Sequence, residues 1–299
     1  MAPEPAAAAA SAAQARPAMA VRLPALAELT RPHNAAMTAF AVAVGALVQA
    51  GPALAPLGAQ LGLAALAGFA FAGAGNALND WVDRDLDAVA HPRRPLPSGR
   101  LASRDALALQ ASLFAVAVVA SAFLSLMVLV VVLAALVLMV GYELRLKDIG
   151  LPGNVAIAAL TGVPFVFGAL AVAGGAQLTP SAGVLAGLAF LATLGREIIK
   201  DVEDVAGDVG RRRTLPMRIG ETSALRLAQA ALLVGVVLSP LPALARPGLG
   251  LAYLPLVGLA DAGFLAAAVR ASEPRLAQRL CKAAMLVALV AFAAGRWSA

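Results

Sequence analysis

Two clusters of acidic residues, far apart in the chain, have the spacing of a metal-binding site. One lies in residues 79–87 and the other in residues 201–208. Residues three and four apart share one face of a helix, so each cluster presents a row of oxygen ligands, with Asp85 and Glu203 off the rows. The first row holds Asn79, Asp80, Asp83 and Asp87, and the second holds Asp201, Asp204 and Asp208.

These two rows, with the basic residues near them, predict a site for Mg²⁺ and a diphosphate. Magnesium prefers oxygen ligands, and it commonly uses one or two carboxylates together with phosphate oxygens. Clustered carboxylates repel one another and need cations to coexist. Departure of a bound diphosphate would leave an allylic cation in apolar surroundings. The residues expected to bind the diphosphate are Asn79 and four basic residues that would hold phosphate oxygens: Arg94, Lys147, Arg196 and Lys200.

The rest of the chain consists mostly of apolar residues. Its 299 residues are 61% hydrophobic and 13% charged, with a mean hydropathy of +0.84, whereas about a quarter of the residues in a soluble domain are charged. We therefore expect an all-α integral membrane protein, surrounded by membrane lipids. No nucleic-acid partner is expected, because the chain has no soluble basic domain and only 5% aromatic residues.

Apolar runs of roughly twenty residues predict membrane-spanning helices. A short turn, residues 121–125, divides the third from the fourth. Breaks of Gly, Pro and charge give nine predicted transmembrane helices, at residues 32–50, 57–79, 103–121, 124–142, 152–172, 181–200, 222–241, 249–270 and 278–296.

The basic residues predict the orientation of these helices. If the N-terminus is cytoplasmic, all of the 23 Lys and Arg residues except Arg246 and Arg296 fall on the inner side, as the positive-inside rule requires. Both acidic clusters then lie on the cytoplasmic face of the cell (inner) membrane. Residues 1–21 are rich in Ala and Pro and predict a disordered tail, and residues 22–299 form the transmembrane domain.

The acidic clusters and the loop after the first one resemble motifs of the UbiA superfamily of intramembrane prenyltransferases. Residues 92–99 resemble the family's P-x-R-P-L-P-S-G stretch. The motif N-D-x-x-D-x-x-x-D corresponds to Asn79, Asp80, Asp83 and Asp87, and D-x-x-x-D corresponds to Asp204 and Asp208. The resemblance extends over nearly everything except the tail.

Three further stretches resemble the branch of that superfamily that includes digeranylgeranylglyceryl phosphate synthase: residues 195–204, 147–154 and 31–34. The resemblance implies helices around a central cavity, a cytoplasmic cap, and Mg²⁺ with a prenyl diphosphate on the two Asp motifs. It favours a glycerol-phosphate lipid hydroxyl as the lipophilic acceptor, and it implies no obligate protein partner. The catalytic residues it implies are Asp83, Asp87, Asp204 and Asp208.

One motif departs from the family pattern. Many members carry Y-x-x-x-K after the fourth helix, whereas here Tyr142 is followed by Arg145 and Lys147. Either basic residue could reach phosphate.

Several polar residues in or beside the apolar helices are candidates for the cavity or the acceptor site. Asn34 and Asn76 would either position the acceptor or bond a neighbouring helix. Asn154 would cap the fifth helix or face the site, and Tyr142 would lie near it. Asp261 lies inside the eighth predicted helix, where an acid is costly, and we expect it to face the cavity, the alternative being a structural pairing with a basic residue.

Two alternative functions remain open. The same chemistry could act on an aromatic or chlorin acceptor, as in quinone or chlorophyll synthesis. The acids could instead line the path of a membrane transporter, although transporters place their binding site near the middle of the membrane.

Overall fold

A computed structural model describes residues 19–175, 177–208, 212–244 and 248–299, with the backbone alone for residues 206–208. Every regular element in these ranges is helical. The long helices are α3 (Pro32–Ala50), α4 (Gly58–Val82), α6 (Ser103–Ala122), α7 (Leu126–Leu144), α8 (Leu151–Val172), α9 (Pro180–Asp208), α11 (Glu221–Leu238), α13 (Tyr253–Val269) and α14 (Pro274–Trp297). The short ones are α2 (Met19–Thr30), η1 (Gly51–Leu57), α5 (Arg84–Ala90), η2 (Leu146–Asp148), α10 (Leu215–Ile219) and α12 (Leu241–Leu244).

Each predicted membrane segment coincides with one of the long helices, within a few residues at most ends. Seven segments of the described chain are long and apolar enough to cross a membrane. One of these, Pro32–Val82, contains both α3 and α4, and α13 is apolar but shorter, with 17 residues. The predicted break between α6 and α7 is confirmed, because Ser125 caps α7 by accepting a hydrogen bond from the Val128 amide at 3.2 Å.

Helices α4 and α9, which carry acidic residues at their C-terminal ends, run further there than hydropathy predicts. Helix α9 continues eight residues beyond the predicted end at residue 200, and α4 continues three residues beyond residue 79. Polar residues support helix as well as apolar ones do, so hydropathy marks where the apolar run ends and not where the helix ends. The second acidic row therefore lies on α9 beyond its apolar run. The helix predicted through the first row is interrupted, because α4 ends at Val82 and Asp87 lies on α5.

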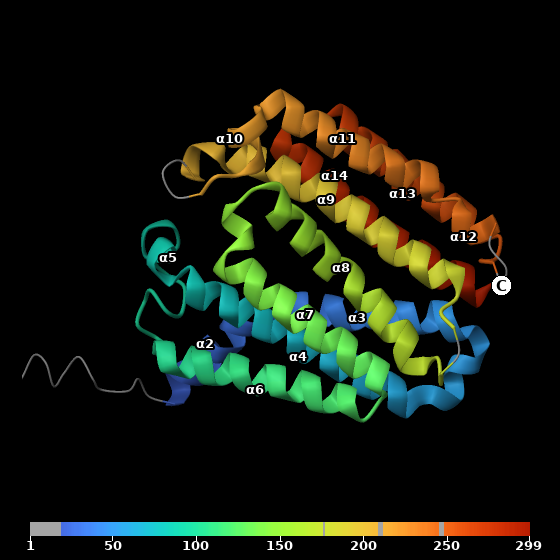
Figure 1. Ribbon diagram of the computed structural model, residues 1–299, viewed down its shortest axis with the longest axis horizontal. Helices are drawn as coiled ribbons and strands as arrows, with labels where there is room; N and C mark the ends of the chain where they lie inside the picture. Colours follow the sequence, from blue (N-terminus) through green and yellow to red (C-terminus); the bar gives the residue numbers. More distant parts are fainter. Residues whose placement is uncertain (1–18, 176, 209–211, 245–247) are drawn as a thin grey trace, which may run out of the picture.

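The chain packs in two groups of helices on either side of α8 (Figure 1). One buried cluster joins α3, α4, α6, α7 and α8, and another joins α9, α10, α11, α13 and α14. Helix α3 approaches α8 so closely that neither Gly45 nor Gly168 has room for a side chain. A Cβ on Gly45 would lie 2.1 Å from the Phe165 carbonyl oxygen, and a Cβ on Gly168 would lie 1.9 Å from the Val42 carbonyl oxygen. Small residues permit such contacts between membrane helices.

The short helices α5 and α10 lie at the same end of the bundle (Figure 1). Because α5 follows α4 and α10 follows α9, the fold brings both acidic rows to that end. Most of the predicted tail, residues 1–18, lies outside the described residues, and its last three residues belong to α2.

Candidate active site

Asp83 lies at the break between α4 and α5. It is the C-cap residue of α4 and the N-cap residue of α5. The Lys147 ammonium is 2.7 Å from its Oδ1, and the Arg212 guanidinium is 3.3 Å from the same atom. The Asn79 amide also donates to Asp83, at 3.1 Å. One carboxylate of the first row is thus contacted by groups from three separate parts of the chain.

The other two acids of the first row share a guanidinium. Arg94 is 2.6 Å from Asp87 and 3.5 Å from Asp80, and both carboxylates are almost completely buried. Asp80 also pairs with Arg31. Asp85, in contrast, is 87% exposed, as its position off the row predicts.

Arg31 is held in an uncommon backbone conformation. Its φ of 47° and ψ of 69° place it in the left-handed region, and it is the one non-glycine residue with positive φ in the described ranges. It precedes Pro32, which opens α3 as proline commonly does. A non-glycine residue in this region costs of order 1 kcal/mol, and here the conformation accompanies the ion pair with Asp80.

The second row lies along α9. Asn154 donates to the Asp201 carboxylate at 3.0 Å, so it faces this row, while Gly150 occupies the cap of α8. Asp204 is about half exposed, and the Lys200 ammonium lies 4.0 Å from it. Asp208 ends the helix, and its side chain lies outside the described residues.

Two more of the expected residues lie beside this row. Arg196 pairs with Glu197, and Lys200 is 3.9 Å from the same glutamate. Glu203 is turned away from the row, since Arg275 and Gln278 of α14 both donate to it. The helical spacing thus agrees with the exposure of Asp85 and with the contacts of Glu203 to α14.

A small polar pocket of about 30 Å³ lies beside the second row, and cations that contact the first row line it. Lys147 and Arg212, which contact Asp83, line this pocket together with Asp201. Thr214 also lines it, and its buried hydroxyl oxygen has no hydrogen-bond partner among the described residues. The remaining walls come from Tyr142, Gly153, Asn154, Ile157, Glu197 and Lys200.

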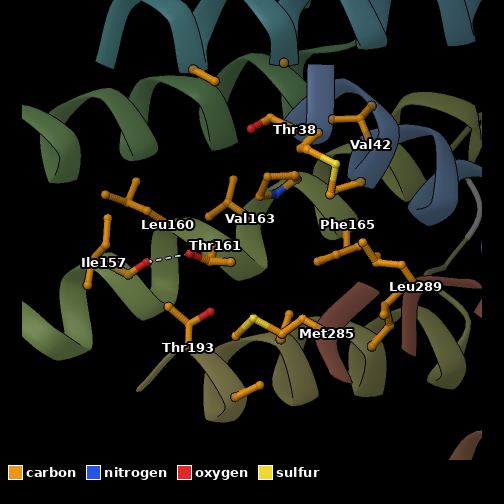
Figure 2. Close-up of a pocket in the computed structure, with 18 of the residues that line it drawn as sticks. Thr38, Val42, Ile157, Leu160, Thr161, Val163, Phe165, Thr193, Met285 and Leu289 are labelled. Carbon is orange, nitrogen blue, oxygen red and sulfur yellow. Dashed lines mark hydrogen bonds between the residues drawn. The ribbon is translucent and has the colours of Figure 1, made fainter. Parts of the chain in front are cut away.

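A much larger apolar cavity of about 450 Å³ adjoins this polar end, within the range of roughly 300–1,000 Å³ typical of ligand sites. Asn79 and Glu143 lie on its wall at the acidic end, and Ile157 lines both cavities. Figure 2 shows side chains from α3, α8, α9 and α14 surrounding one space, with Thr161 donating to the Ile157 carbonyl oxygen at 3.0 Å.

The other sequence candidates fall in different places. Asn34 and Asn76 both line the large cavity, and Asn76 also donates to the Thr30 carbonyl oxygen at 2.9 Å, which ties α4 to α2. Of the two basic residues after Tyr142, Lys147 is buried in the cluster and Arg145 is exposed.

Sequence reasoning missed three residues of this site. Glu143 is 4% exposed and accepts hydrogen bonds from Asn79 at 3.1 Å and from Lys147 at 2.9 Å. Arg31 and Arg212 contact the first row from outside it. An acid within an apolar helix is a functional signal in itself, and that rule would have found Glu143.

The donor set fits magnesium bound together with a diphosphate. Every acidic ligand supplies hard oxygen, and each carboxylate of the first row faces a cation that could turn to a phosphate oxygen. In the described ranges, no three carboxylate, His or Cys side chains converge as a ready-made metal centre, because the acids of the first row face Arg and Lys. A metal diphosphate would satisfy both sets of charges, and a phosphate oxygen would satisfy the Thr214 hydroxyl.

Known proteins resemble this chain over most of its length. Residues 38–293 match the UbiA prenyltransferase family. The digeranylgeranylglyceryl phosphate synthase of Natronomonas pharaonis is 41% identical over 278 residues, covering 92% of this chain and 98% of the relative. The protein of that name from Methanosarcina mazei is 38% identical over 287 residues, covering 90% and 96%.

Solved structures share the fold. A structure described as giving insights into digeranylgeranylglyceryl phosphate synthase in membranes aligns with a TM-score of 0.79 at 28% identity, covering 93% of this chain and 99% of that chain. A UbiA homologue from Archaeoglobus fulgidus, bound to DMAPP and Mg²⁺, aligns with a TM-score of 0.67 at 17% identity, covering 88% and 98%.

Proposed function

The chain belongs to the UbiA prenyltransferase family, and we propose that this multi-pass membrane prenyltransferase joins a geranylgeranyl-type group to a hydroxyl of a glycerol-phosphate lipid. The observation that carries the proposal is a cluster of carboxylates and cations at one end of an apolar cavity of about 450 Å³. The names of relatives about 40% identical over nine-tenths of the chain support this acceptor.

Four carboxylates would hold magnesium in this proposal: Asp83, Asp87, Asp204 and Asp208, with Asp80 and Asp201 beside them. Bound magnesium would supply positive charge that stabilises the departing diphosphate. The acids themselves would fix where that charge is held, at the acidic end of the bundle.

The basic residues would bind the phosphate oxygens directly. Arg94 is suited to a two-pronged contact, and Lys147 and Lys200 act as point charges. Arg196 and the newly found Arg212 extend the same cationic wall, and Asn79 holds Asp83 in place at 3.1 Å. Preorganised donors of this kind stabilise charge as it develops on a leaving group.

The reaction then balances without a further reactant. The bond between the prenyl carbon and the diphosphate oxygen breaks, and its electron pair leaves on that oxygen. The allylic cation lies in the apolar cavity, which excludes water, and the acceptor oxygen forms the new bond. The hydroxyl proton passes to a base, and Glu143 is the cavity-lining carboxylate at the acidic end.

The finer topology belongs to the same proposal. We place nine membrane spans with the acidic end on the cytoplasmic side of the cell membrane, α5 and α10 in a cytoplasmic cap, and the N-terminus on the cytoplasmic side. The distribution of Lys and Arg supports this orientation. Cysteine-accessibility labelling of residues in α5 and α12 would test it, because only the first should react from the cytoplasmic side.

The two alternatives make different predictions. An aromatic or chlorin acceptor would need the same acidic clusters but no recognition of a phosphate monoester. A transporter would bind its cargo near mid-membrane, whereas the acids here gather at one end of the bundle.

One experiment separates the three functions. The purified protein in lipid nanodiscs is incubated with Mg²⁺, labelled geranylgeranyl diphosphate and either geranylgeranylglyceryl phosphate, its dephosphorylated form, or 4-hydroxybenzoate. We expect product and free diphosphate with the first acceptor only, and loss of both on chelation of the metal. Consumption of 4-hydroxybenzoate in place of the lipid would overturn the proposed lipid acceptor. Failure to release diphosphate with any acceptor would overturn the proposed prenyltransferase activity.

A further inference from the structure

One carboxyl group in the wall of the large cavity has no part in the mechanism above. Asp261 lies on α13 and lines the cavity together with Ser239. The Ser239 hydroxyl donates to its Oδ2 at 2.6 Å, and the Tyr253 hydroxyl donates to the Ser239 carbonyl oxygen at 2.6 Å. A polar group is costly inside a membrane helix and is a functional candidate there. This one is held in place by two successive hydrogen bonds.

This pair lies toward the end of the bundle opposite the acidic rows. Helix α11 begins beside α10, and Ser239 follows its last residue, next to α12, which lies at the far end in Figure 1. The cavity thus has a polar group at each end: Asn79 and Glu143 near the acidic rows, and Asp261 with Ser239 far from them. The wall between is mainly apolar.

The separation of the two ends follows from the helix contacts. Gly235 of α11 lies against Leu191 of α9, because a Cβ added to Gly235 would be 3.7 Å from the Leu191 Cβ. Leu191 is ten residues from Asp201, and Ser239 lies four residues beyond Gly235 on the antiparallel helix. At 1.5 Å per residue these steps add to about 21 Å.

This length suits a prenyl chain of a particular size. An extended chain advances roughly 1.2 Å per bond, so about sixteen main-chain carbons, or four isoprene units, span roughly 19 Å. With its diphosphate at the acidic rows, such a chain would end close to Asp261. A fifth unit would press hydrocarbon against the carboxyl group and strip its hydration, which is unfavourable unless another polar partner replaces the water.

We infer that Asp261, held by Ser239, is a polar stop that limits the prenyl donor to about four isoprene units. The inference rests on the proposed function, since it takes the large cavity as the prenyl site. It assigns Asp261 a role in donor specificity, separate from the diphosphate chemistry at the other end.

The test compares donors of different length. Initial rates are measured in nanodiscs with geranylgeranyl diphosphate and with the donor one isoprene unit longer, for the wild type, Asp261→Ala and Asp261→Asn. Asn keeps the size and polarity of the side chain and can still accept from Ser239, whereas Ala removes the polar group. Leu259→Ala is the matched control, because Leu259 is on the same helix and 61% exposed.

We expect the wild type to use the longer donor at least tenfold less well, by kcat/KM. Asp261→Ala should raise the ratio of longer to shorter donor at least tenfold, while Asp261→Asn and Leu259→Ala stay within threefold of the wild type. Equal use of both donors by the wild type would overturn the inference, and so would an unchanged ratio in Asp261→Ala. If Asp261→Ala does not accumulate, the wild-type comparison decides alone. Absence of product with every donor in the wild type would instead refute the proposed function.

Discussion

Replacing Asp83 by Asn changes the carboxylate that joins the two halves of the site while keeping its size. Asp83 is contacted by Lys147 at 2.7 Å, by Arg212 at 3.3 Å and by Asn79 at 3.1 Å. The substitution removes one negative charge from a cluster that we propose binds a metal diphosphate. Stability and activity should therefore respond very differently.

The effect on stability should be small because each cation keeps another carboxylate. Lys147 remains 2.9 Å from Glu143, and Arg212 remains 3.2 Å from Asp148. A buried charge left without a partner costs roughly 3–5 kcal/mol, but neither cation is orphaned here. The expected loss is that of a hydrogen bond, about 1 kcal/mol, which corresponds to a midpoint about 2–4 °C lower.

The effect on turnover should be large. Removing one preorganised group that stabilises developing charge costs about 10²–10³ in kcat, or roughly 3–4 kcal/mol at 1.36 kcal/mol per factor of ten. The assay is release of labelled diphosphate by protein in nanodiscs, read beside a thermal unfolding curve in the same lipid.

Asp85→Asn is the matched control, since Asp85 is in the same motif but 87% exposed. It should stay within about twofold of the wild type in both measurements, because an exposed ion pair contributes little. An Asp83→Asn protein that turns over normally would refute the reasoning, as would one whose activity falls only in proportion to its unfolded fraction.

Three further predictions concern the packing and the cations around the site. Gly168→Ala should lower the unfolding midpoint by several degrees, because its Cβ would lie 1.9 Å from a backbone oxygen of α3 and overpacking costs about 1–3 kcal/mol. The control Gly187→Ala should leave the midpoint unchanged, because Gly187 has open space around it. Equal midpoints for the two variants would contradict the close approach of α3 and α8. Lys147→Met should reduce turnover at least about 10²-fold, as expected for one lost contact to a charged group, while Arg145→Met stays near wild type; a reversal of these two rates would assign the phosphate contact to Arg145. Arg31→Gly and Arg31→Ala should both lose activity. The glycine variant should be more stable than the alanine variant by about 1 kcal/mol, since glycine adopts the left-handed backbone freely. Equal thermal unfolding midpoints of the two variants would mean that this backbone conformation carries no strain.

The elements that position the site are predictable from the sequence where one residue type dominates locally. Apolar runs located the long helices, and Ser125 marked the break before α7. Spacing along a helix separated Asp85 and Glu203 from the two rows. The family resemblance, read from the Asp motifs and the loop after the first, is confirmed by the match over residues 38–293.

What the sequence did not reveal depends on tertiary contacts between distant segments. Lys147 reaches Asp83 across 64 residues and Arg212 reaches it across 129, so no local pattern identifies which cation pairs with which acid. The ends of α4 and α9 were placed too early because hydropathy falls at the membrane boundary while the helix continues. The role of Asp261 needed the course of the cavity, since its position in the sequence gives no distance to the acidic rows.

A crystal structure with Mn²⁺ in place of Mg²⁺ and a non-hydrolysable prenyl thiodiphosphate would test the central claim most directly. Anomalous scattering would locate each metal ion. Our account requires one diphosphate with metal ligands from both rows, Asp83 or Asp87 on one side and Asp204 or Asp208 on the other, and with the prenyl chain in the large cavity. A diphosphate held by one row alone, or bound away from both, would contradict it.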